Sequence, residues 1–165
     1  MTVIQYAAQL TAPWAHLYGD SKLLSSSVVF VHLGGLLLGG GFAVAADRTT
    51  LRMIRQPAAA RRIHLEELHA VHRPVMIGLA ATFASGLLML AADLETFLPA
   101  PLFWLKMGLI AALLGNGLVL RRAEAGLRAG DDSHAGRWRR LERAARTSLF
   151  LWFGSLLLGT ALLAA

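Results

Sequence analysis

The chain alternates long apolar runs with short polar stretches that are rich in arginine. The first run covers residues 23–46, reads LLSSSVVFVHLGGLLLGGGFAVAA and contains a single ionisable side chain, His32. At about 1.5 Å of rise per residue, a helix of this length crosses a bilayer core of roughly 30 Å. Runs of similar character follow further along the chain. We therefore predict four transmembrane helices, at residues 23–46, 74–92, 101–120 and 147–165.

The composition supports this interpretation. Of the 165 residues, 56% are hydrophobic and only 16% are charged, which leaves too little polar surface for a soluble domain. Residues 1–22 combine aromatic side chains with Pro13, a pattern typical of a segment that lies on the membrane surface. We expect an all-α fold in one transmembrane domain, residues 1–165, arranged as an up-down four-helix bundle.

The basic residues predict the orientation. All but two of the 16 lysines and arginines lie in the stretches between spans one and two and between spans three and four. The positive-inside rule places both stretches in the cytoplasm, and hence both termini on the periplasmic or outer side. We read these residues as topology signals and expect no nucleic-acid partner. The predicted location is the bacterial inner membrane, as a multi-pass protein surrounded by lipid.

His32 is the most informative residue of the first span. Gly35 and Gly39 follow it at helical spacing, so the histidine projects beside a glycine groove on one face. An ionisable side chain at this depth requires a partner. The residue is either a functional site or a neutral histidine that forms a hydrogen bond to Ser85, Thr82 or a backbone carbonyl of another helix.

As a site, His32 suggests an axial ligand of b-type haem. A second histidine at the same depth is missing, because His72 lies about 20 Å away by helix rise. Met107 is the most economical second ligand, and Met89, His16 or a second copy of the chain are the alternatives. Histidine and methionine also suit a cuprous ion. The expected cofactor is thus haem b or copper, bound through His32 and Met107, or no cofactor at all.

Three further groups of residues carry hypotheses. His64, His69 and His72 follow one another on a predicted amphipathic helix and form a plausible metal surface, although histidines that simply face water are the alternative. A basic segment near the last span suggests contact with anionic lipid headgroups. Small residues on the first and last spans suggest close helix packing. The headgroup residues are Arg137, Trp138, Arg139 and Arg140, and the packing residues are Gly35, Gly39, Ser155 and Gly159.

Two segments, HLGGLLLGGGFAVAADRTTLR and FLPAPLFWLKMGLIAALLGNGLVL, resemble a small uncharacterised bacterial family of four-helix integral membrane proteins. The pattern is also loosely similar to copper-resistance D-like proteins and to four-helix b-type cytochromes. The resemblance implies four spans, and the cytochrome likeness implies haem held by paired histidines. This chain departs from the cytochrome pattern, because only His32 lies at membrane depth.

These observations predict a small accessory or structural subunit that docks onto a larger redox or energy-transducing membrane complex through its glycine faces. The alternative is a b-type haem or copper protein that uses His32 for electron transfer or metal handling. A transporter or channel is a third hypothesis, with His32, Lys106 and Asn116 as its polar residues. We expect other membrane subunits as partners and no catalysis on a soluble substrate.

Overall fold

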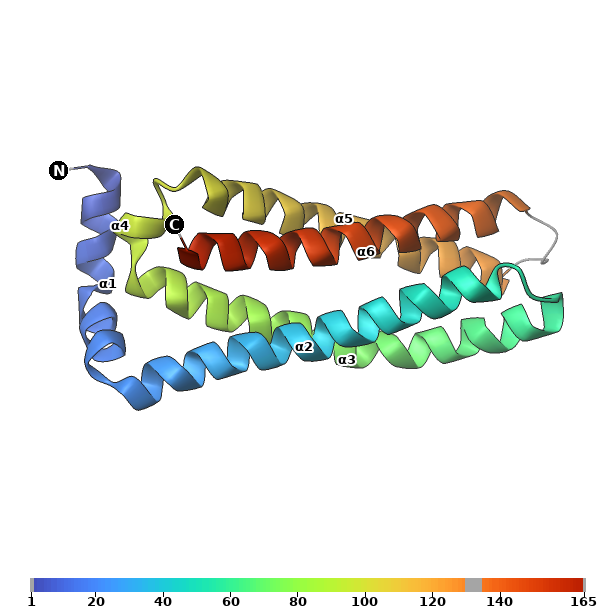
Figure 1. Ribbon diagram of the computed structural model, residues 1–165, viewed down its shortest axis with the longest axis horizontal. Helices are drawn as coiled ribbons and strands as arrows, with labels where there is room; N and C mark the ends of the chain where they lie inside the picture. The colour runs from blue at the N-terminus through green and yellow to red at the C-terminus, as the bar shows by residue number, and fades with distance from the viewer. Residues whose placement is uncertain (1, 130–134, 165) are drawn as a thin grey trace.

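The chain is all-helical, as predicted. The computed structural model describes residues 2–129 and 135–164, and no strand occurs in these ranges. Four helices are long and apolar enough to cross a membrane, which agrees with the four predicted spans. The elements are α1 (Val3–Asp20), α2 (Lys22–Met53), α3 (Ala58–Ala92), α4 (Leu94–Phe97), α5 (Pro101–Ala129) and α6 (Ala135–Ala164) (Figure 1).

The four long helices form two antiparallel hairpins, α2 with α3 and α5 with α6 (Figure 1). The hairpins contact each other mainly through α2 and α6. One such contact is close: the ring of Trp152 lies 3.1 Å from the position that a Cβ on Gly40 would occupy. Each hairpin is therefore a unit in itself, and a small residue on α2 lets the second hairpin approach.

The helix α1 lies across one end of the bundle (Figure 1). Its first turn is closed by a capping box between Thr2 and Gln5, and Pro13 lies within the helix. The indole of Trp14 donates a hydrogen bond of 2.8 Å to the carbonyl oxygen of Leu88 near the end of α3. The segment predicted to lie on the membrane surface is thus a helix tied to the bundle, and we call this end the α1 end.

The long helices exceed the predicted spans at the opposite end, which we call the arginine-rich end. They contain 32, 35, 29 and 30 residues, whereas about 20 suffice to cross the bilayer. The predicted lead-in before Pro74 and the second span are one continuous helix, α3. The extensions bury an apolar cluster of their own, the extension core, which consists of Leu65, Leu68, Ala123, Leu127, Trp138 and Leu141.

Glycines bring α2 and α3 into backbone contact. A Cβ on Gly78 of α3 would lie 2.6 Å from both the carbonyl oxygen of Gly35 and the Cα of Gly39. A Cβ on Gly35 would in turn lie 2.8 Å from the carbonyl oxygen of Gly78. These distances are too short for real carbon contacts. The three glycines therefore allow an approach that no larger residue permits, as in other membrane helix pairs with small residues.

We predict that Gly78→Ala destabilises the protein, because the new methyl group meets the backbone of α2. The expected cost is about 1–3 kcal/mol, seen as a lower midpoint of thermal unfolding in mild detergent. Gly34→Ala is the matched control, since nothing lies within 4 Å of its Cβ position. Alanine also favours a helix over glycine by roughly 0.5–1 kcal/mol. An unchanged midpoint for Gly78→Ala would contradict the backbone contact.

Candidate functional site

His32 is held by a hydrogen bond to α3. Its Nδ1 lies 3.1 Å from the hydroxyl oxygen of Ser85, one of the three hydrogen-bond partners predicted for a neutral His32. Ser85 itself donates to the carbonyl oxygen of Ala81 at 2.6 Å. Ser85 also lies 3.1 Å from the carbonyl oxygen of Thr82, and its single hydroxyl hydrogen serves these carbonyl oxygens. We therefore assign the contact with His32 as a donation from Nδ1, which leaves a lone pair on Nε2.

The remaining lone pair has no hydrogen-bond partner among the described residues. The ring lies with its Cε1 edge against α3, 3.3 Å from the Cβ position of Gly86. Metal-binding histidines are usually oriented in this way, by a hydrogen bond on the nitrogen that does not bind the metal. The contact with Ser85 thus serves packing and leaves Nε2 able to act as a ligand or proton acceptor.

The glycine groove beside His32 is filled by the chain itself. Gly35, Gly39 and Gly78 are all buried between α2 and α3. These glycines therefore pack within the chain and do not form an open groove for another subunit. Any group that binds Nε2 must approach from a side of His32 other than the groove.

Lys106 and Met107 are consecutive residues of α5. The ammonium of Lys106 lies 3.6 Å from the Cβ position of Gly159 on α6, and it is near enough to His32 to interact with it electrostatically. Within the described chain it makes no ion pair with Asp93 or Glu95. Met107 is half-buried on the same helix and stays a predicted second ligand of His32.

Asn116 and Ser155 are two further polar residues of α5 and α6. The amide of Asn116 donates to the carbonyl oxygen of Ala144 at 2.9 Å, which ties α5 to α6. Ser155 is buried on α6, and its hydroxyl has no partner. Ser155 lies inside the molecule, and Gly159 faces Lys106 of its own chain. The predicted pair of small residues therefore contributes to packing within one chain.

A second group of polar residues lies at the arginine-rich end. Glu124 of α5 is only 2% exposed, and its Oε2 lies 2.8 Å from Nε2 of His72 on α3. The guanidinium of Arg128 stands 3.9 Å from the same oxygen. The other oxygen, Oε1, is buried without a partner. A carboxylate inside the bundle is therefore paired on one side only.

Asp47 of α2 contributes a second buried carboxyl group, with 4% of its surface exposed. The hydroxyl of Ser148 on α6 interacts with it, and Glu124 lies near enough to repel its charge. Its Oδ2 is buried without a partner. Together with His72, these residues define the acid cluster, to which all four long helices contribute: Asp47, His72, Glu124 and Ser148.

The predicted metal surface on α3 does not form. His64 is buried and its Nε2 lies 2.9 Å from the hydroxyl of Thr50 on α2, whereas His72 meets Glu124 on α5. His69 is exposed and touches only the ring of His72, at 6.2 Å between centroids. His64 and His69 are five residues apart, and this spacing rotates their side chains by about 140° around the helix axis. Within the described ranges no three histidine or acidic side chains are placed to hold a metal ion.

The predicted headgroup segment is divided between core and surface. Trp138 is 3% exposed and belongs to the extension core, with the guanidinium of Arg61 stacked 4.8 Å above its ring. Arg137 donates to the carbonyl oxygen of Gly126 at the end of α5. Arg139 and Arg140 are exposed. Only these two remain available to lipid, because the tryptophan packs inward and Arg137 binds the backbone.

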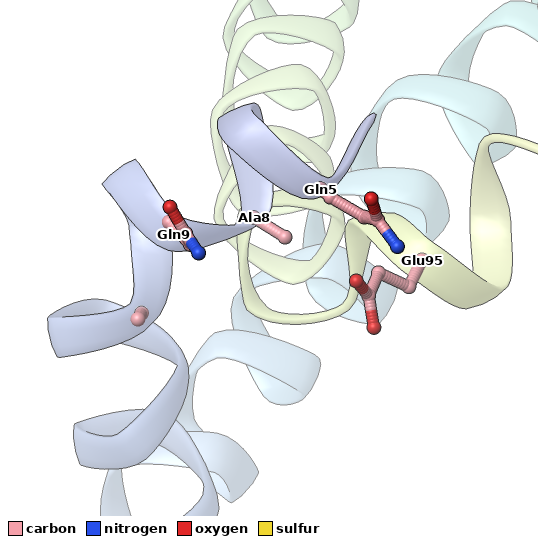
Figure 2. A pocket seen from close by; sticks show the side chains of 5 residues that line it. Gln5, Ala8, Gln9 and Glu95 are labelled. Atoms are coloured by element: carbon pink, nitrogen blue, oxygen red, sulfur yellow. The ribbon is translucent and has the colours of Figure 1, made fainter. Parts of the chain in front are cut away.

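A shallow hollow of about 460 Å³ lies between α1 and α4 at the α1 end. Figure 2 shows the side chains of Gln5 and Glu95 close together at its rim, with Ala8 and Gln9 on the α1 side. The amide oxygen of Gln5 is already used by the capping box. The hollow is open and lined by few groups, so it forms no enclosed binding site.

Comparison with protein-family models, with curated proteins and with solved structures found no match. Function must therefore be inferred from the two polar sites, around His32 and around the acid cluster.

Sequence reasoning missed Asp47, Thr50 and Glu124. Asp47 looked like the residue that ends the first helix, but α2 continues to Met53. Glu124 looked like one more charge in a basic loop, although it shares a helix face with Leu120 and Leu127 at spacings of four and three residues. That apolar spacing on both sides was the available signal for a buried acid.

We predict that His72→Ala destabilises the arginine-rich end, because it leaves the buried carboxylate of Glu124 without its nearest partner. The loss of a partner by a buried polar group costs about 1–3 kcal/mol, and more when the group is charged. Thermal unfolding in detergent measures the loss. His69→Ala, an exposed histidine on the same helix, is the control and leaves the midpoint unchanged. Equal midpoints for both variants would show that the pair contributes nothing.

Proposed function

We propose that this protein binds a redox cofactor or metal ion within the membrane through Nε2 of His32, and that it serves electron transfer or metal handling. The observation that carries the proposal is the contact of 3.1 Å between Nδ1 of His32 and Ser85, which fixes the direction of the ring. With Nδ1 assigned as the donor, the other nitrogen keeps its lone pair. Neutral imidazole is a ligand for both haem iron and copper.

The chain offers one ligand whose ring is oriented by a hydrogen bond, His32. His32 would hold the iron of a b-type haem or a cuprous ion, and Ser85 would position its ring. Bound haem or copper would supply one-electron chemistry. Lys106, which interacts electrostatically with His32, would favour an acidic group such as a carboxylate beside the ligand. Met107, Met89, His16 or a second copy of the chain would supply the second metal ligand.

The accessory-subunit hypothesis stays a prediction, but the glycines no longer support it. The glycines expected to meet a partner are used within the chain, so docking would depend on the lipid-facing side chains instead. Such exposed apolar residues are required by the bilayer itself and do not indicate a partner. For this reason we place the ligand function of His32 first.

We further propose that the protein lies in the bacterial inner membrane with its arginine-rich end in the cytoplasm and both termini outside. The support comes from the unequal distribution of arginine between the two ends.

The ligand proposal predicts that full-length protein from cells supplied with haem and copper carries one of them. A reduced-minus-oxidised absorption spectrum detects haem, and elemental analysis detects copper. His32→Ala loses the cofactor, while Ser85→Ala weakens binding about 10–100-fold because the ring is no longer oriented. His69→Ala retains full occupancy. Wild-type protein with neither haem bands nor more copper than His32→Ala would refute the proposal.

The orientation predicts the labelling of two single-cysteine variants, which are simple to build because the chain contains no cysteine. Gly19→Cys at the α1 end reacts with a membrane-impermeant maleimide in spheroplasts. Gln56→Cys, exposed between α2 and α3, reacts only after the membrane is opened. The reverse pattern would show that the protein is inserted the other way round.

A further inference from the structure

The acid cluster at the arginine-rich end contains buried carboxyl oxygens without partners, and the proposed function gives them no role. Asp47 and Glu124 are 4% and 2% exposed, and each has one carboxyl oxygen that is buried without a partner. An ionised carboxyl group in such surroundings loses its hydration and must be compensated by a proton or a cation. The question is which of the two acids is compensated by the chain.

The negative charge of Glu124 is compensated by neighbouring basic side chains, whereas that of Asp47 is not. On one oxygen, Glu124 meets His72 at 2.8 Å and Arg128 at 3.9 Å. Asp47 forms no ion pair within the described residues, and the groups that face it are the hydroxyl of Ser148 and the like charge of Glu124. On α3, Nε2 of His64 contacts Thr50, while Nδ1 of His64 is buried without a partner, and His72 meets Glu124. Within the described residues, Asp47 thus forms no ion pair with a positive side chain.

A proton on Asp47 cancels the uncompensated charge. It also relieves the repulsion from Glu124, which lies near enough to interact with Asp47 electrostatically. A metal ion is a poorer solution, because the cluster does not offer three acidic or histidine ligands in suitable positions within the described chain.

The cluster also offers a route to solvent. His72 is the exposed member, with 29% of its side-chain surface accessible, and its Nε2 contacts Glu124. An imidazole ring can accept and release a proton. A proton can therefore pass from solvent to His72, from its imidazolium to the carboxylate of Glu124, and from that carboxyl group to the carboxylate of Asp47, and each donor is left in its deprotonated form.

We propose that Asp47 is a proton-binding group, and that Glu124 and His72 exchange its proton with solvent at the arginine-rich end. The site is separate from His32, which lies about 20 Å further along α2 by helix rise. It gives the protein a place to take up a proton at the border of the first span, whatever His32 binds.

Infrared spectroscopy of the full-length protein in detergent tests the proposal directly. Near neutral pH, wild-type protein shows a carbonyl stretch of a protonated carboxyl group, which shifts in D2O and disappears at high pH. Asp47→Asn, which keeps the shape of the side chain, lacks this band. Glu142→Gln, which removes an acid paired with Arg146 on the surface of α6, keeps it.

Two further variants test the route. Glu124→Gln moves the Asp47 band, because the neighbouring charge is gone. His72→Gln leaves the band in place but slows its shift after transfer to D2O several-fold. Wild-type protein without a protonated-carboxyl band, or a band that persists in Asp47→Asn, would overturn the assignment. Because the wild-type band can be titrated with pH, the test stands even if Asp47→Asn fails to fold.

Discussion

The backbone contact between Gly78 of α3 and the glycines of α2 determines the register of the first hairpin. Once Gly78 lies between Gly35 and Gly39, the two helices cannot slide without a clash. His32 then meets Ser85 on one side of the contact, and Thr50 meets His64 on the other. Both polar pairs depend on this glycine contact, beside which the hydroxyl of Thr82 lies 2.7 Å from the Cβ position of Gly35. Glycine is used here for its small size and not for an unusual backbone conformation.

The molecule combines two kinds of packing along the same helices. In the bilayer, lipid tails are as apolar as leucine, so helices associate through close fit and hydrogen bonds. In water the hydrophobic effect operates, and the helix extensions past the predicted spans bury an apolar core around Leu141 and Trp138. The acid cluster lies near the border between the predicted spans and these extensions. The extension core joins the two hairpins at one end and thereby holds carboxyl groups in a place where neither water nor a cation compensates them fully.

The spans could be predicted from the sequence because they depend on the length and hydropathy of each apolar run. Contacts between helices depend instead on how each helix is rotated about its own axis. The partner of His32 was among the three that the sequence suggested, since Ser85 lies at a similar depth. The prediction of a metal surface on α3 was wrong because His64 contacts α2 and His72 contacts α5. Asp47 and Glu124 were missed because a charge beside arginines looks like part of a loop, and only the continued helices show that it is buried.

The hairpin arrangement also has a consequence for biogenesis. Helices α2 and α3 leave the ribosome one after the other and can pair while the rest of the chain is still being made. The acid cluster cannot close at that stage, because Glu124 belongs to α5 and Ser148 to α6. Asp47 and His72 must remain hydrated until α5 and α6 have been made. Their place at the end of the first hairpin, just beyond the predicted spans, allows this, since two such groups at the bilayer centre would oppose insertion.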